Sequence, residues 1–146
     1  MIVYDYVGKE SKEDDPPPKG AVRVWRDRLA VAQRAQLDQK LTMLSGAAVD
    51  LLPGLIAGPL SIKGKKYAHV YKLQIGGKVR LRPLLCKGPA DPNRELTLLV
   101  GAFERGGELD PISAPQTAVE RRQEVIDNVK LRKPYRFPED EIDPPV

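Results

Sequence analysis

Residues 67–86, YAHVYKLQIGGKVRLRPLLC, carry the pattern that decides the fold class. Aliphatic and aromatic residues alternate with polar ones on both sides of Gly76 and Gly77. This alternation is typical of two antiparallel strands joined at a glycine turn. Residues 67–75 and 79–86 are therefore predicted to form a hairpin.

The side-chain pattern also indicates the length of the turn. A two-residue loop would place Leu73 opposite Arg80, so that apolar and charged side chains meet on both faces. A three-residue loop through Lys78 instead gives one apolar face for a helix to cover and one polar face. The pairs expected in this register are Ile75 with Val79, Leu73 with Leu81, Gln74 with Arg80, and Lys72 with Arg82.

The chain before the hairpin changes from strand to helix periodicity. Residues 2–7 alternate as a short strand, and 8–20 form a polar, proline-broken connector. Residues 21–46 are then expected to form a helix, followed by a short helical piece at 48–55 that Pro53 ends. The apolar stripe of the long helix consists of Val22, Trp25, Leu29, Ala32, Leu37, Leu41 and Leu44.

After the hairpin, residues 96–103, LTLLVGAF, form an almost continuously apolar run that is typical of a strand covered on both faces. Ser113 and Gln116 resemble a capping box that opens a helix with Val119, Ile126 and Val129 facing inward. The segment 130–146 is expected to be an extended, Pro-rich acidic tail. The prediction is an α+β domain at 21–129, a small antiparallel sheet with an N-terminal helix or helix pair on one face and a C-terminal helix.

Charge is concentrated in the middle of the 146-residue chain, although its net charge is only +4. Nine cations and one acid lie between Ile62 and Glu95. One-sign charge on a rigid sheet suits a phosphate backbone, so RNA is the first partner to consider. The single Cys86 and single His69 argue against a disulfide framework and a zinc site, and favour a cytoplasmic setting. No membrane helix, metal or cofactor is expected.

Two stretches resemble the small RelE and HigB bacterial toxins. Residues 70–88, VYKLQIGGKVRLRPLLCKG, are similar to the family's hairpin, in which an Arg-bearing strand follows a glycine turn. Residues 96–126, LTLLVGAFERGGELDPISAPQTAVERRQEVI, resemble the strand and helix of phage-derived HigB-like members. The resemblance covers 22–128 and includes the order of elements. It implies a toxin that cuts messenger RNA, usually in the ribosomal A site, and that a small antitoxin neutralises.

The resemblance assigns roles to particular residues. Lys72 stands at the family's strand lysine, Arg80 at its phosphate-contacting arginine, and Arg105 near a charged pair that closes the next strand. Glu104, where many relatives have a cation, and Gln74, where they have a lysine, depart from the pattern. No tyrosine or histidine occupies the family's C-terminal catalytic position.

Metal-free RNA cleavage needs few protein groups, because the substrate's own 2′-hydroxyl attacks the phosphate. Arg80 and Arg82 would clamp the phosphate, and Lys72 would stabilise the attacking oxygen or act as base. His69 and Tyr71 lie on the opposite face from Lys72, so neither fits the role of general acid. The expected catalytic residues are Lys72, Arg80, Arg82 and Arg105, and the expected RNA-binding residues are Lys63, Lys65, Lys66, Gln74, Lys78 and Lys87.

The same residues permit a second interpretation of a different class. A cationic cluster can also be the solvated polar face of a sheet. The alternative is therefore a non-catalytic binding module on the same scaffold, either a phage-derived assembly component or a toxin that blocks a protein. In that case a larger assembly would hold the N- and C-terminal extensions.

Overall fold

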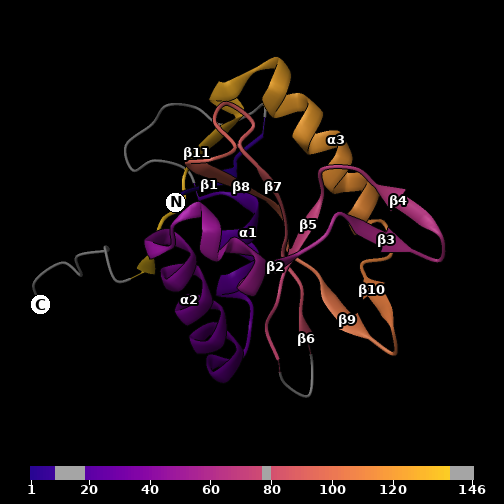
Figure 1. Ribbon diagram of the computed structural model, residues 1–146. Coiled ribbons are helices and arrows are strands. Elements are labelled where there is room, and N and C mark those ends of the chain that lie inside the picture. The colour runs from indigo at the N-terminus through magenta and orange to yellow at the C-terminus, as the bar shows by residue number, and fades with distance from the viewer. Residues whose placement is uncertain (9–18, 77–79, 139–146) are drawn as a thin grey trace, which may run out of the picture.

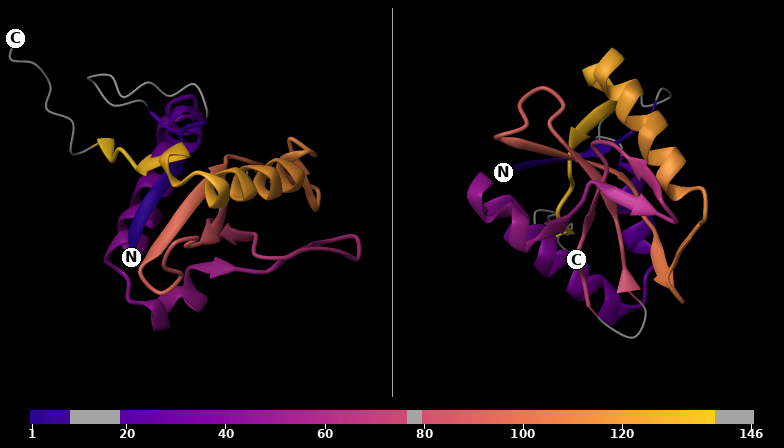
Figure 2. Two further views of the ribbon diagram at one scale, coloured as in Figure 1. Left: turned by 90° about the horizontal axis from the view of Figure 1, so that it is seen from above. Right: turned by 45° about the vertical axis from the view of Figure 1, so that its right-hand side comes forward.

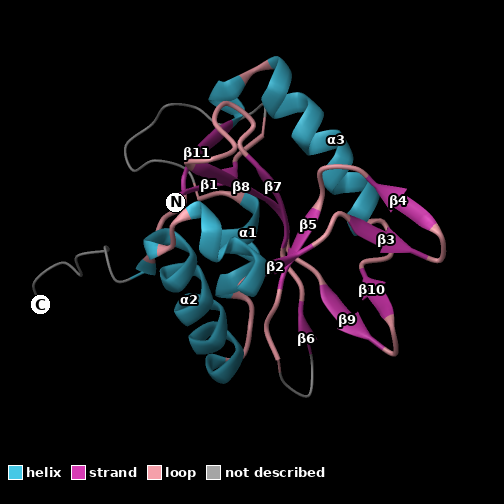
Figure 3. Ribbon diagram, viewed as in Figure 1, coloured by secondary structure: helices cyan, strands magenta, loops and turns pink. Residues whose placement is uncertain are grey.

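The structure, a computed structural model, describes residues 1–8, 19–76 and 80–138 (Figure 1). It is an α+β fold in which helices lie against a mixed sheet (Figure 3). Lys78 and most of the connector at 8–20 lie outside the described residues. The helical elements are α1 (Ala21–Asp27), α2 (Val31–Gly46), α3 (Ala114–Asp127) and the 3₁₀ turns η1 (Val49–Gly54) and η2 (Val129–Leu131).

Among the described residues, the largest sheet has six strands in the order β11-β1-β8-β7-β5-β2. Strand β1 runs parallel to β8, whereas the other pairs are antiparallel. The sheet is thus larger than the small antiparallel one expected, and it is mixed. Its strands are β1 (Ile2–Tyr6), β2 (Ile56–Ala57), β5 (Tyr71–Leu73), β7 (Leu84–Lys87), β8 (Glu95–Val100) and β11 (Arg132–Pro134).

Helices cover both faces of this sheet (Figure 2). On one face, α2 contributes Leu37, Leu41 and Leu44, which pack in one core with Leu96 and Leu98 of β8. On the other face, α3 contributes Ala114 and Ala118 to a second core that contains Leu99. Each face of β8 therefore contacts a separate core, which confirms the prediction of a strand covered on both sides.

The predicted N-terminal helix is broken in two. Helix α1 ends at Asp27, and Ala30 has extended backbone angles before α2 begins. The break shifts the phase of the apolar stripe, so Val22 and Leu37 both reach the core while Ala32 is exposed. Five-residue spacing between Ala32 and Leu37 was the sequence signal of this break, because a regular helix returns to one face every three or four residues.

The predicted pairing of Lys72 with Arg82 is wrong, whereas Val79, the predicted partner of Ile75, lies outside the described residues. Lys72 lies opposite Leu84 rather than Arg82, and Tyr71 lies opposite Leu85. Pro83 explains the difference, because it has no N–H to donate and separates β7 from the preceding strand β6 (Arg80–Leu81). Strand β6 instead pairs with β9 (Phe103–Arg105). The expected apolar face nevertheless exists, since Leu73, Ile75 and Leu81 are all buried in the core on the α2 side.

Two small sheets extend from the body of the domain (Figure 1). One is the hairpin of β3 (Leu60–Ile62) and β4 (Lys65–Tyr67). The other consists of β6, β9 and β10 (Glu108–Asp110) in the order β10-β9-β6. An ion pair of 3.1 Å joins Lys63 of the first sheet to Glu108 of the second. The junction of the large sheet with these extensions is where the candidate site lies.

The C-terminal part differs from the prediction in three ways. Helix α3 buries Ala114, Ala118 and Val125, whereas Ile126 and Val129 are exposed. Ser113 precedes α3 without making a side-chain cap. The start of the predicted tail also belongs to the fold, because β11 pairs with β1 and Tyr135 is buried in the core. No helix in the described ranges could span a membrane.

Candidate functional site

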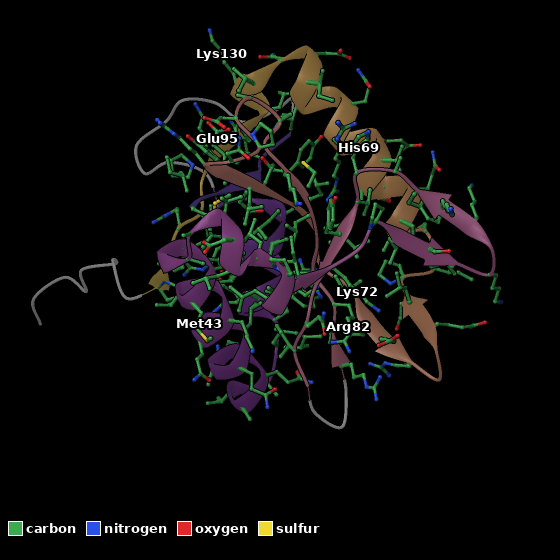
Figure 4. All side chains as sticks on the ribbon, in the orientation of Figure 1. Met43, His69, Lys72, Arg82, Glu95 and Lys130 are labelled. Carbon is green, nitrogen blue, oxygen red and sulfur yellow. The ribbon has the colours of Figure 1, made fainter. Side chains whose placement is uncertain are left out.

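Lys72 and Arg82 are labelled near each other in Figure 4, in the region where the large sheet and the β10-β9-β6 sheet adjoin. Lys72 lies opposite Leu84, and the Leu73 N–H donates to the Pro83 carbonyl at 3.0 Å. These contacts place Lys72 next to the segment that contains Arg82. Leu73 faces the α2 core, so the half-buried Lys72 side chain points to the opposite face of the strand.

Arg82 is a buried structural residue. Only 8% of its surface is exposed, and its Nη1 donates to the carbonyl oxygens of Ile75 at 2.6 Å and Leu81 at 2.9 Å. Its Nε donates to Oε2 of Glu104 at 3.1 Å. A guanidinium whose donors are used in this way holds the two sheets together and has little capacity left for a substrate phosphate.

Glu104 connects Arg82 to the surface. The same Oε2 atom lies 3.7 Å from Nη1 of Arg80, directly opposite on β6. The side chain of Arg80 is 60% exposed, and that of Glu104 is 19% exposed. The row Arg82, Glu104 and Arg80 thus runs from the interior to solvent. One carboxylate neutralises part of the charge of two guanidinium groups.

A hollow of about 440 Å³ lies beside this row, lined by Arg80, Glu104, Arg105, Gly106 and Gly107. The Arg105 guanidinium stacks 5.3 Å from the ring of Phe103 and lies 3.9 Å from an Asp110 oxygen. Phe103 and Glu104 point to opposite faces of β9, so Arg105 flanks the hollow without facing the carboxylate. Arg80, Arg82 and Arg105 of the predicted catalytic set are therefore brought to one region with different accessibilities, whereas Lys72 lies on strand β5 and does not line the hollow.

The predicted RNA-binding residues form separate groups. Lys63, Lys65 and Lys66 are exposed on the β3–β4 hairpin. Gln74 and Lys87 instead line a second hollow between η1 and β2, where the Lys87 ammonium lies 4.9 Å from the centre of the Tyr71 ring. The sequence cluster of cations is thus divided between the sheet junction, a projecting hairpin and a cleft.

The structure supplies a base candidate but leaves the acid unassigned. Tyr71 faces the cleft with Lys87, and His69 is exposed toward α3, away from Lys72 and Arg82 (Figure 4). Glu104 is the carboxylate at the centre of the cluster. In the sequence it stood out only as a departure from the toxin pattern, at a position where many relatives have a cation. Glu104 comes two residues after buried Ala102 in the chain. The pairing of β6 with β9 places it opposite Arg80. A partly exposed carboxylate between two arginines can accept a proton from a bound hydroxyl.

Two further observations concern groups outside the cluster. Burial raises the pKa of the Cys86 thiol to about 11, as expected for an unreactive buried cysteine. Within the described ranges, histidine, cysteine and carboxylate side chains form no cluster that could hold a metal ion.

Comparison of the chain with protein-family models, with curated proteins and with solved structures finds no match.

Proposed function

We propose that the protein is an RNA-cleaving toxin of the RelE and HigB kind, acting on translated messenger RNA in the cytoplasm. The observation that carries the proposal is the carboxylate of Glu104 held beside the exposed guanidinium of Arg80 and bordering an open hollow. The order of strand, helix pair and strands before α3 also supports it. A small antitoxin protein would be the partner, and the ribosome a second one, as the resemblance implies.

The reaction assigns a role to each group at the junction. Glu104 would take the proton of the 2′-hydroxyl, whose oxygen then forms a bond to the adjacent phosphorus. The bond from phosphorus to the 5′ oxygen breaks, and that oxygen takes a proton from solvent. Arg80 and Lys72 would balance the charge that develops on the phosphate oxygens. The products are a 2′,3′-cyclic phosphate and a 5′-hydroxyl, so no cofactor or metal is needed.

Arg82 has an indirect role in this proposal. Its bond to Oε2 of Glu104 fixes the carboxylate, and its bonds to two carbonyl oxygens fix the guanidinium. Arg82 is thus a positioning residue, and Arg105 flanks the hollow. This revised assignment keeps Lys72 and Arg80 as the groups that would contact RNA.

Expression of the chain in bacteria tests the proposal. The native protein should arrest growth and fragment messenger RNA, whereas Arg80→Ala and Glu104→Gln should each lower cleavage about 100-fold, by analogy with loss of one charge-stabilising group. Arg94→Ala is the matched control, because Arg94 is equally cationic and its side chain is 83% exposed on another loop. Native protein that neither slows growth nor cuts purified RNA would overturn the proposal.

A non-catalytic binding module is the second candidate. The observation that favours it is the pairing of the Glu104 carboxylate with two arginines, an arrangement that also serves a purely structural role. In this case RNA or a protein would bind at the junction without being cut. RNA binding that Arg80→Ala weakens, together with intact RNA after long incubation, would favour the module.

A further inference from the structure

The β3–β4 hairpin is a projecting cationic ribbon that the cleavage mechanism does not use. It projects from the large sheet beside one end of α3 (Figures 1 and 2). Lys63, Lys65 and Lys66 are all exposed on it; the Lys63 side chain is 75% exposed, and its ammonium lies 3.1 Å from the exposed Glu108 carboxylate. Half-buried Ile62, next to the turn, and half-buried Tyr67, at the base, pack against the α3 core. The ribbon is thus fixed to the domain while its lysines reach solvent.

The turn of the hairpin contains an unfavourable residue. Ile62 pairs with Lys65, so Lys63 and Gly64 form a two-residue loop, and their φ angles are 50° and 81°. Both positions need a left-handed backbone, as type I′ hairpin turns do. Glycine and asparagine adopt it easily, whereas lysine does so at a cost. Lys63 therefore holds a strained backbone position, at which its ammonium also pairs with Glu108.

The lysines point in several directions from the ribbon. Lys65 lies on the same face as Tyr67, with its ammonium 5.1 Å from the ring centre. Lys66, opposite Ser61, points to the other face, and Lys63 occupies the tip. A flat anionic surface would contact only one of these directions. The two rows of phosphates that border a duplex groove could be contacted on both sides of the ribbon at once.

The ribbon is poorly suited to single-stranded RNA. Proteins that bind single strands usually stack bases on exposed aromatic rings. The Tyr67 ring is half-buried in the α3 core and has Lys65 over it. Lysine acts as a point charge on a flexible stem and recognises phosphate without reading bases. The ligand chemistry is therefore a phosphate backbone.

We propose that the β3–β4 hairpin binds the backbone of double-stranded RNA, independently of sequence and separately from the strand that Arg80 and Glu104 would cut. The inference rests on the proposed function for RNA as the ligand, and it extends that function to a structured RNA.

The test measures the affinity of the purified full chain for a labelled 20-base-pair RNA duplex and for a 20-nucleotide single strand. Lys63→Asn should weaken duplex binding about threefold while the melting temperature rises by about 2 °C, because the turn relaxes. The triple variant with Lys63→Asn, Lys65→Gln and Lys66→Gln should bind the duplex more than tenfold more weakly than the native chain. Its affinity for the single strand should stay within twofold of the native value. Lys130→Gln is the control, since this exposed lysine lies at the far end of the domain (Figure 4).

Three results would overturn the inference. The triple variant could bind the duplex as tightly as the native chain, or lose single-strand binding to the same extent. Lysine-dependent binding to vesicles that contain anionic lipid, as tight as binding to the duplex, would assign the ribbon to a membrane instead. None of these measurements involves cleavage, so a failure of the proposed nuclease activity is detected separately through Arg80→Ala.

Discussion

The sheet junction and the β3–β4 hairpin are both cationic, but they hold their charge differently. At the junction, the Arg82 guanidinium is buried and donates to two carbonyl groups and a carboxylate. On the hairpin, Lys65 and Lys66 are exposed. Arginine suits the first environment because its planar fork bonds several fixed acceptors, and lysine suits the second because its ammonium stays hydrated. Of two equal charges in the sequence, one stabilises the fold and the other remains available to a ligand.

Of the variants that test this difference, a replacement of Arg82 should change the stability of the protein most. Arg82→Met should lower the free energy of unfolding by about 4 kcal/mol, because it leaves Glu104 without its buried partner and the Ile75 and Leu81 carbonyls without donors. Urea unfolding followed by circular dichroism measures the loss. Arg80→Met is the matched control, since it removes an exposed cation from the same carboxylate and should cost less than about 1 kcal/mol. A stable Arg82→Met protein that no longer binds RNA would show instead that Arg82 serves in RNA binding and not in stability.

Asp5 extends the comparison to a buried carboxylate that accepts backbone N–H groups. It is 2% exposed and accepts the N–H groups of Val22 at 3.0 Å and Arg23 at 2.9 Å, at the start of α1. Gly20 leaves room for it, because a Cβ there would overlap the Asp5 carboxyl group. Burial raises the pKa of Asp5 from 3.8 to about 7, although the N–H donors oppose the shift.

The raised pKa of Asp5 predicts stability that falls as pH rises. Between about pH 4 and pH 7 the folded state binds more protons at Asp5 than the unfolded state, so folding is favoured at the lower pH. The free energy of unfolding should decrease by about 3 kcal/mol across this window. Urea unfolding at pH 4.5, 6 and 7.5 tests the slope, and Asp5→Asn should remove most of it. Equal slopes in both proteins would show that another group titrates.

A charge-conserving exchange should have an intermediate effect. Arg132 is 6% exposed, donates to Glu95 at 2.8 Å and to the Gly88 carbonyl at 3.3 Å, and lies 3.8 Å from the centre of the Tyr4 ring. Arg132→Lys keeps the charge but loses the fork and the stacking, so it should cost about 2 kcal/mol in thermal or urea unfolding. Lys66→Arg on the hairpin is the reciprocal control and should leave stability unchanged. An Arg132→Lys variant with the native free energy of unfolding would mean that charge alone matters at the buried site.

Much of the fold could be predicted because its pattern is local. Strand β1, helix α2 and the twice-covered strand β8 follow from the periodicity of their own apolar residues. Pro83 was a local signal against the predicted pairing, since a proline inside a run marks an edge or an end of a strand. Lys63-Gly64 was likewise a local turn signal that the prediction omitted. These two corrections needed no information beyond the sequence.

The remaining differences come from contacts between distant residues. Strand β11 has only three residues, and it forms because the edge of β1 is open to it. The burial of Arg82 depends on Glu104, which is 22 residues away in the chain. The sequence pattern predicted that Lys72, Arg80 and Arg82 would be near each other, but not which of them would be exposed. Accessibility depends on tertiary pairing, which alternation along one strand does not contain.

The smallest expected effect belongs to a single lysine of the ribbon. Lys66→Gln should change the free energy of unfolding by less than about 0.5 kcal/mol, because the side chain is exposed on β4. Its effect should appear instead in the salt dependence of duplex binding, where one lost phosphate contact lowers the slope of log K against log salt by about 1. Arg82→Met, by contrast, should alter stability with an unchanged slope in the fraction that remains folded. If Lys66→Gln destabilised the protein while the slope stayed constant, the hairpin lysines would belong with the structural arginines.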